Sequence, residues 1–496
     1  MAYVCFLSIL CLGCTREEAP ANSRGHEVRI AYSEDFVHRA WDSEPRFLVF
    51  LPLVGSDERG EPEGRLAHAW EFSPDYRETT YHLRTDVDWH DGTPVTARDV
   101  EFTLWLQTQP EGEMSPRAVE SVTVVDDSTV TVRGRTSEWD DRWTVILPAH
   151  LLNGLEPDRI WEWEFWKHPV GNGPYRFVRY VPQTLMEFEA NPAYYRGKPR
   201  IERVTLKFLE GAPPLLELLS GNVDAFPGAS PAQIRRLATD TRFVVYQSIS
   251  VTEARVIYWQ TDHPILGDPR VRRALALAID RRGLLRLLDL PSDGPLVDGP
   301  YTARQIRRGD LPEPLPYDPD AARELLEADR WIDEDGDGVR EREGSPLRFT
   351  AITRAYFAQP GEQELMIYVQ EQLRRVGVHM EIEVLDQGII SQRRRSADFE
   401  AWFSWYNSAI FWFRPPTGYF HQLAGLLDSA EEALDPDVRD RLYEELAEIF
   451  REDMPITFLF PDVWTWVAHR RIHGLSSPWR VDPLWNMEHL WVEEER

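Results

Sequence analysis

Residues 65–105 read RLAHAWEFSPDYRETTYHLRTDVDWHDGTPVTARDVEFTLW, and this stretch decides the fold of the region around it. Apolar and polar residues alternate around Trp70 and again around Tyr81, with a Ser-Pro-Asp turn between the two runs, which predicts a β-hairpin. Thr96 and Asp99 have the spacing of a capping box, so a helix is expected to begin there. The stretch therefore predicts strand, turn, strand, turn and helix.

His90 stands next to Asp91 in the second turn, where the pair could be taken for a catalytic dyad. A hydrolase would need further groups that converge on the same point, and the flanking turn residues favour packing instead. The chain has no His-Glu-x-x-His run, no Gly-x-Ser-x-Gly elbow and no Walker loop. We therefore expect no catalytic residues, no enzyme activity and no cofactor; a hydrolase that uses His90 and Asp91 is the remote alternative.

Length and composition restrict the class of protein. The 496 residues exceed what one hydrophobic core usually fills, so two or more lobes are expected. The mean hydropathy of -0.44 is typical of a water-soluble body. The formal net charge of -28 repels phosphate backbones, which argues against a nucleic acid partner.

The beginning of the chain predicts export and lipidation. All three cysteines lie within the run MAYVCFLSILCLGC, which has the length of a signal peptide and is too short for a permanent membrane span. Its end, Leu-Gly-Cys, resembles a bacterial lipobox, in which the cysteine carries lipid and becomes the first mature residue. We expect a lipoprotein signal over residues 1–14, lipidation at Cys14 and a flexible tether over residues 15–26. A plain secretory signal is the alternative.

Strand and helix patterns alternate along the body of the chain, which favours mixed α/β lobes. The pattern predicts a pair of strands at residues 243–249 and 255–260, and a return of the chain at residues 456–460 and 464–467. A helical apolar stripe follows the first pair. We therefore place the boundary between two lobes near Thr261.

Residues 332–344, IDEDGDGVREREG, resemble a calcium-binding loop because Asp333, Asp335 and Asp337 occupy alternate positions. Such a loop needs a bidentate Glu at its twelfth position, where this chain has Gly344. A solvated acidic turn without a metal is the favoured interpretation, and a structural cation at the three aspartates is the alternative.

Several segments, taken in order, resemble family 5 of the bacterial extracellular solute-binding proteins, the peptide- and nickel-binding components of ABC importers. They are WEFSPDYRETTYHLRTDVDWHDGTPVTARDVEFTL, PVGNGPYRFVRY, NPAYYRGKPRIERVTLKF, LLSGNVDAF, DPRVRRALALAIDRRGLL, YDPDAARELLEADRWIDEDGDG and DFEAWFSW. The resemblance implies an α/β fold of the type II periplasmic-binding-protein kind, with two lobes, two crossover strands and a ligand cleft between the lobes. It implies a first lobe over residues 27–260 with an inserted subdomain at about 49–181, a second lobe over 261–479, and a return to the first lobe over 480–496.

The function that the resemblance implies is capture and delivery of a solute. A lipid-anchored monomer in the cell envelope, in the periplasm or on the outer face of the cytoplasmic membrane, would close its lobes over a peptide or another small organic solute and deliver it to an ABC permease. Contact with the membrane would come only through the lipid anchor. A ligand-sensing or interaction protein of the same fold, without transport, is the alternative.

The resemblance also suggests ligand-binding residues. In peptide-binding relatives an Asp a few residues after a Trp pairs with the peptide amine. Trp405 matches that Trp, but Tyr406, Asn407 and Ser408 follow it and none of them is acidic. Arg394 falls where some relatives carry an anchoring Arg.

The run AWFSWYNSAIFWFRPP is rich in aromatic residues. Alternate residues of the strand predicted at 399–406 must belong to the core. Beyond that strand we expect Trp412, Phe413 and Arg414 to form a wall of the cleft that stacks on a sugar or an apolar ligand.

Overall fold

The computed structural model describes residues 26–32, 45–57, 62–108, 119–134, 144–294, 296–301, 305–306, 309, 311–354, 362–407, 423–433, 435–475, 484 and 486–493. The predicted signal, the lipidation site Cys14 and the tether up to residue 25 lie outside the described residues. Within the described ranges, none of the helices is both long enough and apolar enough to cross a membrane.

The elements alternate along the chain as an α/β protein requires. The helices are α1 (Arg46–Val49), α2 (Ala97–Gln107), α3 (Ala149–Leu152), α4 (Pro214–Leu219), α5 (Pro231–Leu237), α6 (Pro269–Leu277), α7 (Arg281–Leu287), α9 (Pro319–Ala328), α10 (Glu362–Arg374), α11 (Gln387–Arg395), α13 (Ala424–Glu432), α14 (Pro436–Asp453) and the 3-10 helices η3 (Pro157–Glu162), η4 (Glu164–Lys167) and η6 (Met487–His489). The strands are β1 (Glu27–Tyr32), β2 (Val54–Ser56), β3 (Pro62–Gly64), β4 (Ala67–Phe72), β5 (Glu78–Leu83), β6 (Val119–Asp126), β7 (Thr129–Gly134), β8 (Tyr175–Val181), β9 (Leu185–Ala190), β10 (Arg203–Phe208), β11 (Ala225–Pro227), β12 (Phe243–Trp259), β13 (Glu341–Arg342), β14 (Ser345–Pro346), β15 (Arg348–Arg354), β16 (His379–Leu385), β17 (Ala401–Asn407), β18 (Ile456–His469), β19 (Ile472–His473) and β20 (Trp491–Val492).

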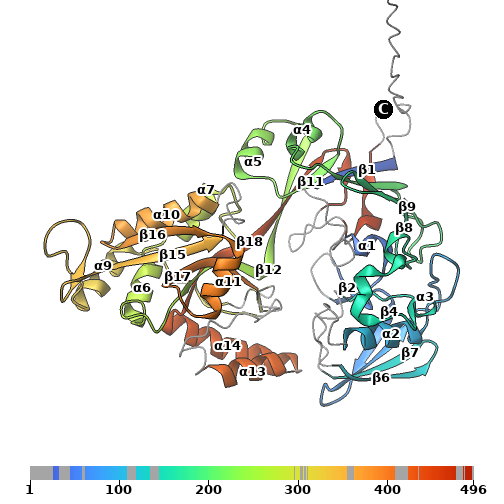
Figure 1. Ribbon diagram of the computed structural model, residues 1–496, viewed down its shortest axis with the longest axis horizontal. Helices are drawn as coiled ribbons and strands as arrows, with labels where there is room; N and C mark the ends of the chain where they lie inside the picture. The colour runs from blue at the N-terminus through green and yellow to red at the C-terminus, as the bar shows by residue number, and fades with distance from the viewer. Residues whose placement is uncertain are drawn as a thin grey trace, which may run out of the picture.

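One ten-stranded sheet runs through both lobes of the described molecule, in the order β16-β15-β17-β12-β18-β11-β1-β10-β9-β8 (Figure 1). Strands β16, β15 and β17 belong to the second lobe, and β11, β1, β10, β9 and β8 belong to the first. Between these groups, β12 and β18 pair with each other and enter both lobes. The predicted α/β fold with two lobes is confirmed. The predicted residue limits of the lobes and of the inserted subdomain stay predictions.

Two predicted pairs of strands are each one long strand in the structure, so this part of the sequence prediction is wrong. Residues 243–249 and most of 255–260 belong to β12, and residues 456–460 and 464–467 belong to β18. The prediction ended each strand where the alternation of apolar residues breaks. In the structure an irregularity in the pairing takes up the extra residues, and both strands continue past it.

The chain passes between the lobes inside β12 and β18. The pairing register of β12 with β18 shifts between Ile249 and Ala254. Before the shift, the part of β18 that pairs with β12 also borders β11 of the first lobe. After it, β12 also pairs with β17 of the second lobe. We call residues 249–255 of β12 and residues 461–464 of β18, taken together, the crossing.

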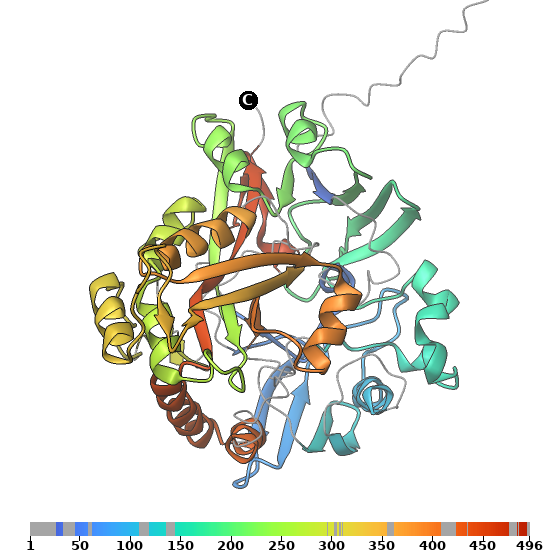
Figure 2. The same cartoon turned by 60° about the vertical axis from the view of Figure 1, so that its left-hand side comes forward.

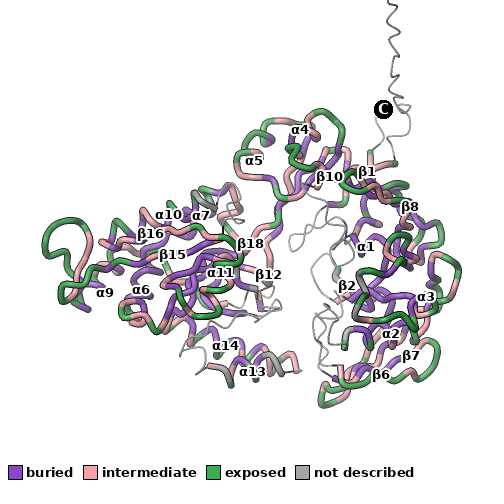
Figure 3. Tube along the Cα trace, in the orientation of Figure 1, coloured by how far each residue is buried: buried purple, intermediate pink, exposed green. Residues whose placement is uncertain are grey.

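Each lobe has its own hydrophobic core (Figure 3). In the second lobe, α6, α7, α9 and α10 cover the face of the sheet that carries Trp259, and α11, α13 and α14 cover the face that carries Trp402. Figure 2 brings this lobe forward and shows helices on both sides of its strands. In the first lobe, Ile30 of β1 and Tyr81 of β5 share one core. The lobes are thus separate packed bodies on a common sheet.

The stretch that begins at Arg65 folds as the sequence predicts. Strands β4 and β5 form an antiparallel hairpin, within the four-stranded sheet β4-β5-β7-β6. Helix α2 begins with the predicted capping box, in which the backbone N–H of Thr96 donates to the Asp99 carboxylate at 2.8 Å. Local turn and cap chemistry is therefore sufficient to specify this segment.

The C-terminal residues 486–493 lie against the first lobe. The Glu488 carboxylate forms an ion pair with Arg65, and both side chains are only 4% exposed. Burial alone would lower the pKa of Arg65, but the negative charge of Glu488 raises it, so the guanidinium stays charged. Leu490 packs into the core of the first lobe. This segment follows β18, so it helps to fix one end of that strand.

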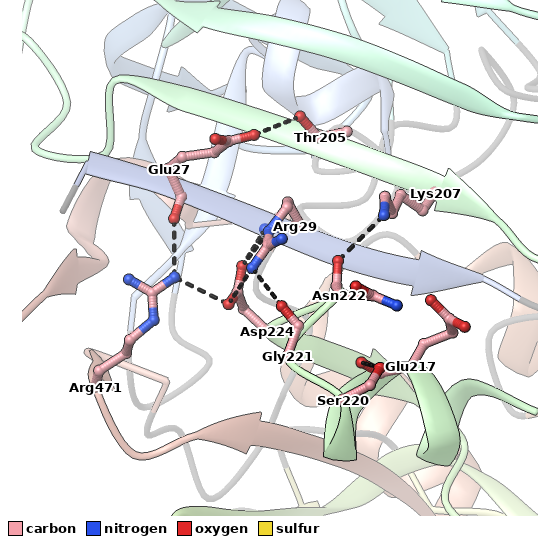
Figure 4. A network of polar contacts seen from close by, with 10 residues as sticks. All are labelled: Glu27, Arg29, Thr205, Lys207, Glu217, Ser220, Gly221, Asn222, Asp224 and Arg471. Atoms are coloured by element: carbon pink, nitrogen blue, oxygen red, sulfur yellow. Dashed lines mark hydrogen bonds and ion pairs between the residues drawn. The ribbon is translucent and has the colours of Figure 1, made fainter. Parts of the chain in front are cut away.

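Asp224 holds the same end of β18 through a network of polar contacts (Figure 4). Its carboxylate accepts bonds from Arg29 Nε of β1 at 3.1 Å and from the Arg471 guanidinium, just after β18, at 2.9 Å. Arg471 also donates to the backbone carbonyl of Glu27 at 3.3 Å. Burial alone would raise the pKa of the Asp224 carboxyl, but the two arginines bring it below its usual value. The network anchors β18 in the first lobe.

Asp224→Asn removes the charge that neutralises Arg29 and Arg471. We expect it to lower the free energy of unfolding of the first lobe by about 3 kcal/mol, because two mostly buried guanidinium groups, 19% and 13% exposed, then lose the charged partner that they share. Chemical denaturation measures the loss. Asp86→Asn is the matched control, since Asp86 pairs with Arg84 in an exposed position and such pairs contribute at most about 1 kcal/mol. Equal losses in the two variants would contradict an anchoring role for Asp224.

Candidate functional site

The crossing brings together four side chains that come from two strands. Glu253 and Arg255 lie on β12, and Asp462 and Trp464 lie on β18. The indole Nε1 of Trp464 donates to the Glu253 carboxylate at 3.2 Å. Arg255 Nε lies 3.4 Å from Asp462 Oδ1. Trp464 is 46% exposed although it lies on a strand of the central sheet. An accessible aromatic ring beside charged groups can offer a ligand both an apolar face and hydrogen-bond partners.

The irregular pairing at the crossing explains why these side chains meet. Ile249 pairs with Val463 and Ala254 pairs with Pro461, so more residues of β12 than of β18 lie between the two pairs. The backbone N–H of Glu253 donates to the Ser250 hydroxyl at 3.0 Å instead. Irregularities of this kind change the direction of a side chain and are frequent next to functional sites.

Two predicted ligand-binding residues, Trp405 and Asn407, lie beside the crossing in β17. The backbone of Trp405 is opposite Arg255, and that of Asn407 is opposite Glu253. Tyr406, between them, is 6% exposed, and its ring packs edge-on against Phe458 at a centroid distance of 5.2 Å. Tyr406 is thus a core residue of the second lobe by its contacts. The other predicted residues of this run lie outside the described part of the chain: Ser408, Trp412, Phe413 and Arg414.

Arg394, also predicted to bind ligand, lies on α11 in the second lobe. Its guanidinium carbon is 5.7 Å from the centre of the Trp402 ring, which stacks on Tyr258 at 4.9 Å. Burial lowers the pKa of Arg394, and so does the positive charge of Arg395. The structure does not bring Arg394 into the group of side chains at the crossing, and its role in binding stays a prediction.

Sequence reasoning missed the four side chains at the crossing. The family pattern points to the region of Trp405 and marks neither Glu253 nor Trp464 as a ligand-binding residue. These two residues are 211 positions apart, so no spacing in the sequence connects them. The signal in the sequence was weak, because Trp464 is an aromatic residue at the start of the strand predicted at 464–467, and the exposure of its ring is seen only in the structure.

His90 and Asp91 do not form a dyad, so the hydrolase alternative loses its proposed machinery. His90 Nε2 donates to the carbonyl of Gly173 at 3.1 Å, and its Nδ1 accepts from the N–H of Gly171 at 3.3 Å. Asp91 instead lies 2.8 Å from His150 Nε2. Burial lowers the pKa of His90 to about 4, so the ring is neutral at pH 7 and joins two segments of backbone.

This burial makes stability depend on pH. The pKa of His90 falls from 6.5 to about 4 on folding, so the unfolded chain binds an extra proton between these values. Stability that is present above pH 6.5 is therefore lost as the pH falls, by about 2 kcal/mol between pH 7.5 and pH 5. Chemical denaturation measures the free energy of unfolding at each pH. For His90→Gln this free energy should fall by about 2 kcal/mol less than for the wild type between pH 7.5 and pH 5. His168→Gln changes an exposed histidine, so its free energy of unfolding should depend on pH as that of the wild type does. The same dependence of the free energy of unfolding on pH in all three proteins would contradict the burial of a neutral His90.

The acidic turn gathers the three predicted aspartates. Oxygen atoms of Asp333, Asp335, Asp337 and Glu341 all lie within 4.8 Å of one another. Sequence reasoning did not include Glu341, which reaches the turn because Ile332 and Glu341 form a bridge. Asp333 and Asp337 also accept bonds from backbone N–H groups of the turn itself. This arrangement fits a solvated turn as well as a structural cation, so both alternatives stay predictions.

A cavity of about 490 Å³ lies in the second lobe, at the end of β17 away from the crossing. Ion pairs line part of it, with Arg393 2.8 Å from Glu383 and His263 3.4 Å from Glu400. Within the described residues, these pairs already satisfy much of the charge in the cavity. We therefore place the candidate site at the crossing and not in this cavity.

Comparison with known proteins supplies the context for this geometry. The family model described as "Bacterial extracellular solute-binding proteins, family 5 Middle" matches residues 61–425. The chain is 24% identical over 446 residues to the oligopeptide-binding protein AppA of Bacillus subtilis (strain 168), which covers 83% of this chain and 80% of that protein. Among solved structures, the fold is similar to that of AppA from Bacillus subtilis in complex with a nonapeptide, with a TM-score of 0.69, 20% identity, and coverage of 94% of this chain and 99% of the other.

A second solved structure is also similar: NikZ from Campylobacter jejuni in complex with Ni(L-His), with a TM-score of 0.72, 21% identity, and coverage of 94% of this chain and 99% of the other. The two-lobe fold and the family that the sequence predicts are both confirmed. Because the family model matches well over half of its length, the chain belongs to family 5 of the bacterial extracellular solute-binding proteins.

Proposed function

We propose that this protein is the substrate-binding component of an ABC importer, which captures a peptide or another small organic solute between its lobes and delivers it to a membrane permease. The observation that carries the proposal is the crossing, where two strands join separate lobes and an exposed Trp464 lies among charged side chains. The family supports the same function. The crossing offers groups that can bind a ligand, whereas His90 and Asp91 are each held in bonds to other parts of the first lobe.

Capture works by closure of the lobes. A ligand that contacts both lobes binds the closed arrangement more tightly than the open one, and this difference in affinity shifts the equilibrium toward closure. Bending is expected at the crossing, where the ladder of hydrogen bonds between β12 and β18 is irregular. A permease can then distinguish loaded from empty protein by the relative position of the lobes.

The ligand is assigned to the class of peptides and other small organic solutes. AppA, a similar protein, binds a nonapeptide in its solved structure, and NikZ binds Ni(L-His). We place the ligand between the lobes, next to β17. Residues assigned to it from the sequence are Arg394, Trp405, Tyr406, Asn407, Ser408, Trp412, Phe413 and Arg414, with Tyr406 acting from the core.

The protein is further proposed to act as a monomer in the cell envelope, in the periplasm or on the outer face of the cytoplasmic membrane. The Leu-Gly-Cys triplet that ends at Cys14 supports a lipid anchor, and the polar residues after it would serve as the tether. Anchoring keeps the binding protein close to its permease, which raises the effective concentration of each for the other.

Identification of the ligand tests this function. Native mass spectrometry of protein purified from its own cell envelope should show an added mass of a few hundred daltons or more. The isolated solute, added to ligand-free protein at a hundred times its Kd, should stabilise the fold by about 2.7 kcal/mol and raise the Tm. Cells that lack the protein should lose uptake of that solute. No bound mass and no stabilising solute would overturn the proposal, and undiminished uptake would favour a sensing role instead.

A further inference from the structure

An ion pair joins the two lobes beside the crossing. Nη1 of Arg235, on α5, contacts a carboxylate oxygen of Asp289, which follows α7. Leu237 of α5 packs in a core with residues of β1 and β11 in the first lobe. Leu288, next to Asp289, packs in a core of the second lobe. Each partner is therefore fixed to a different lobe, and we call Arg235 and Asp289 the inter-lobe pair.

Further contacts hold the loop after α7 against the first lobe. The Asp289 carbonyl accepts a bond at 3.3 Å from the side chain of Gln247, on the part of β12 that precedes the crossing. A Cβ at Gly294 would lie 2.6 Å from Ile249 Cδ1, so this part of the loop packs directly on the first residue of the crossing. Arg282 of α7 donates to the Gly294 carbonyl and ties the same loop to the second lobe. The inter-lobe pair thus belongs to a contact that lies next to the crossing.

The turn that ends α7 does not itself need an aspartate. Asp289 has a φ of +53°, in the left-handed region where glycine is favoured at the C-terminus of a helix. Its N–H donates to the Arg286 carbonyl at 3.2 Å, and the N–H of Leu290 donates to the Leu285 carbonyl at 2.9 Å. Both bonds come from the backbone and would form equally well with glycine. The carboxylate of Asp289 therefore contributes outside the turn, in its contact with Arg235.

The position of the inter-lobe pair decides how closure of the lobes affects it. In Figure 1, α5 and α7 lie above the crossing, whereas β6 of the first lobe and α13 of the second lobe lie below it. A rotation of the lobes about the crossing that brings β6 and α13 closer together moves α5 away from α7. An ion pair requires its two groups within about 4 Å of each other, so this rotation breaks it. The inter-lobe pair is therefore present only while β6 and α13 are far apart, which we call the open arrangement.

We propose that the inter-lobe pair stabilises the open arrangement of the ligand-free protein. This inference rests on the proposed function, in which the solute binds the closed arrangement. The side chains of Arg235 and Asp289 are 59% and 31% exposed, and an ion pair of this kind changes an equilibrium up to about fivefold. The apparent affinity for a solute falls with the fraction of protein that can close, so the pair weakens binding by a similar factor.

Reversal of one charge gives the first test. Electron paramagnetic resonance measures the distance between spin labels at Val125 on β6 and Ser429 on α13 in the full ligand-free chain. Arg235→Glu replaces attraction by repulsion and should raise the ratio of closed to open protein about tenfold, which adds a population at shorter distances. Arg235→Glu combined with Asp289→Arg restores opposite charges and should return the wild-type distribution.

Replacement of the aspartate by glycine gives the second test. Asp289→Gly suits the left-handed backbone, so the Tm should stay close to that of the wild type. The variant lacks the carboxylate, so its ratio of closed to open protein should rise up to about fivefold, and the co-purified solute should bind more tightly by the same factor. Glu187→Gln is the matched control, because Glu187 pairs with Arg179 inside the first lobe. It should leave the distances and the affinity unchanged.

The outcomes separate this inference from the function on which it rests. Wild-type distances in both ligand-free Arg235→Glu and ligand-free Asp289→Gly overturn the role of the inter-lobe pair, and so does a shift of either variant to longer distances. A shift in Arg235→Glu that Asp289→Arg does not reverse also overturns it. These distances are measured without solute, so solute binding by the wild type can stand when they fail. If no solute co-purifies with the wild type or stabilises it, the proposed function fails instead.

Discussion

The pairing of β12 with β18 is the interaction on which the rest of the structure depends. Their backbones pair along most of their length, and together they pass through both lobes. In the first lobe, Asp224 and Arg471 hold the end of β18. In the second lobe, the buried indole of Trp259 donates to Thr457 at 2.9 Å, which joins the two strands inside the core. Firm anchors at both ends leave the irregular crossing as the place where the pair can bend.

The irregular pairing of β12 with β18 allows bending and also decides which side chains are exposed at the crossing. A regular ladder would point alternate side chains into one core or the other, as β12 does beyond the crossing, where Ile257 and Tyr258 belong to opposite cores. At the crossing the alternation is interrupted: Ala254 still belongs to a core of the second lobe, but Glu253 and Asp462 are only partly buried and Trp464 is exposed. Glu253 and Trp464 lie there, bonded to each other, with the ring half exposed. A ligand held at this point lies between the lobes, so its binding energy can favour closure.

Local features of the fold could be predicted from the sequence, because turn and cap residues act over a few positions. The hairpin after Arg65 and the capping box of Thr96 are such features. The long strands could not be predicted, since the alternation of apolar residues breaks at the crossing while the backbone pairing, which is a long-range property, continues. The pairing also decides the site. Glu253 meets Trp464 only once β12 and β18 have folded together, whereas the region of Trp405 could be found from the family pattern alone.

When a ligand binds, the lobes are expected to move relative to each other about the crossing. Electron paramagnetic resonance can measure this as the distance between spin labels at Val125 on β6 and Ser429 on α13, which lie in different lobes and are both exposed. With the co-purified solute bound, the distribution of distances between the two labels should shift to shorter values and become narrower. The same distribution with and without a solute that raises the Tm would show binding without closure and would contradict the account.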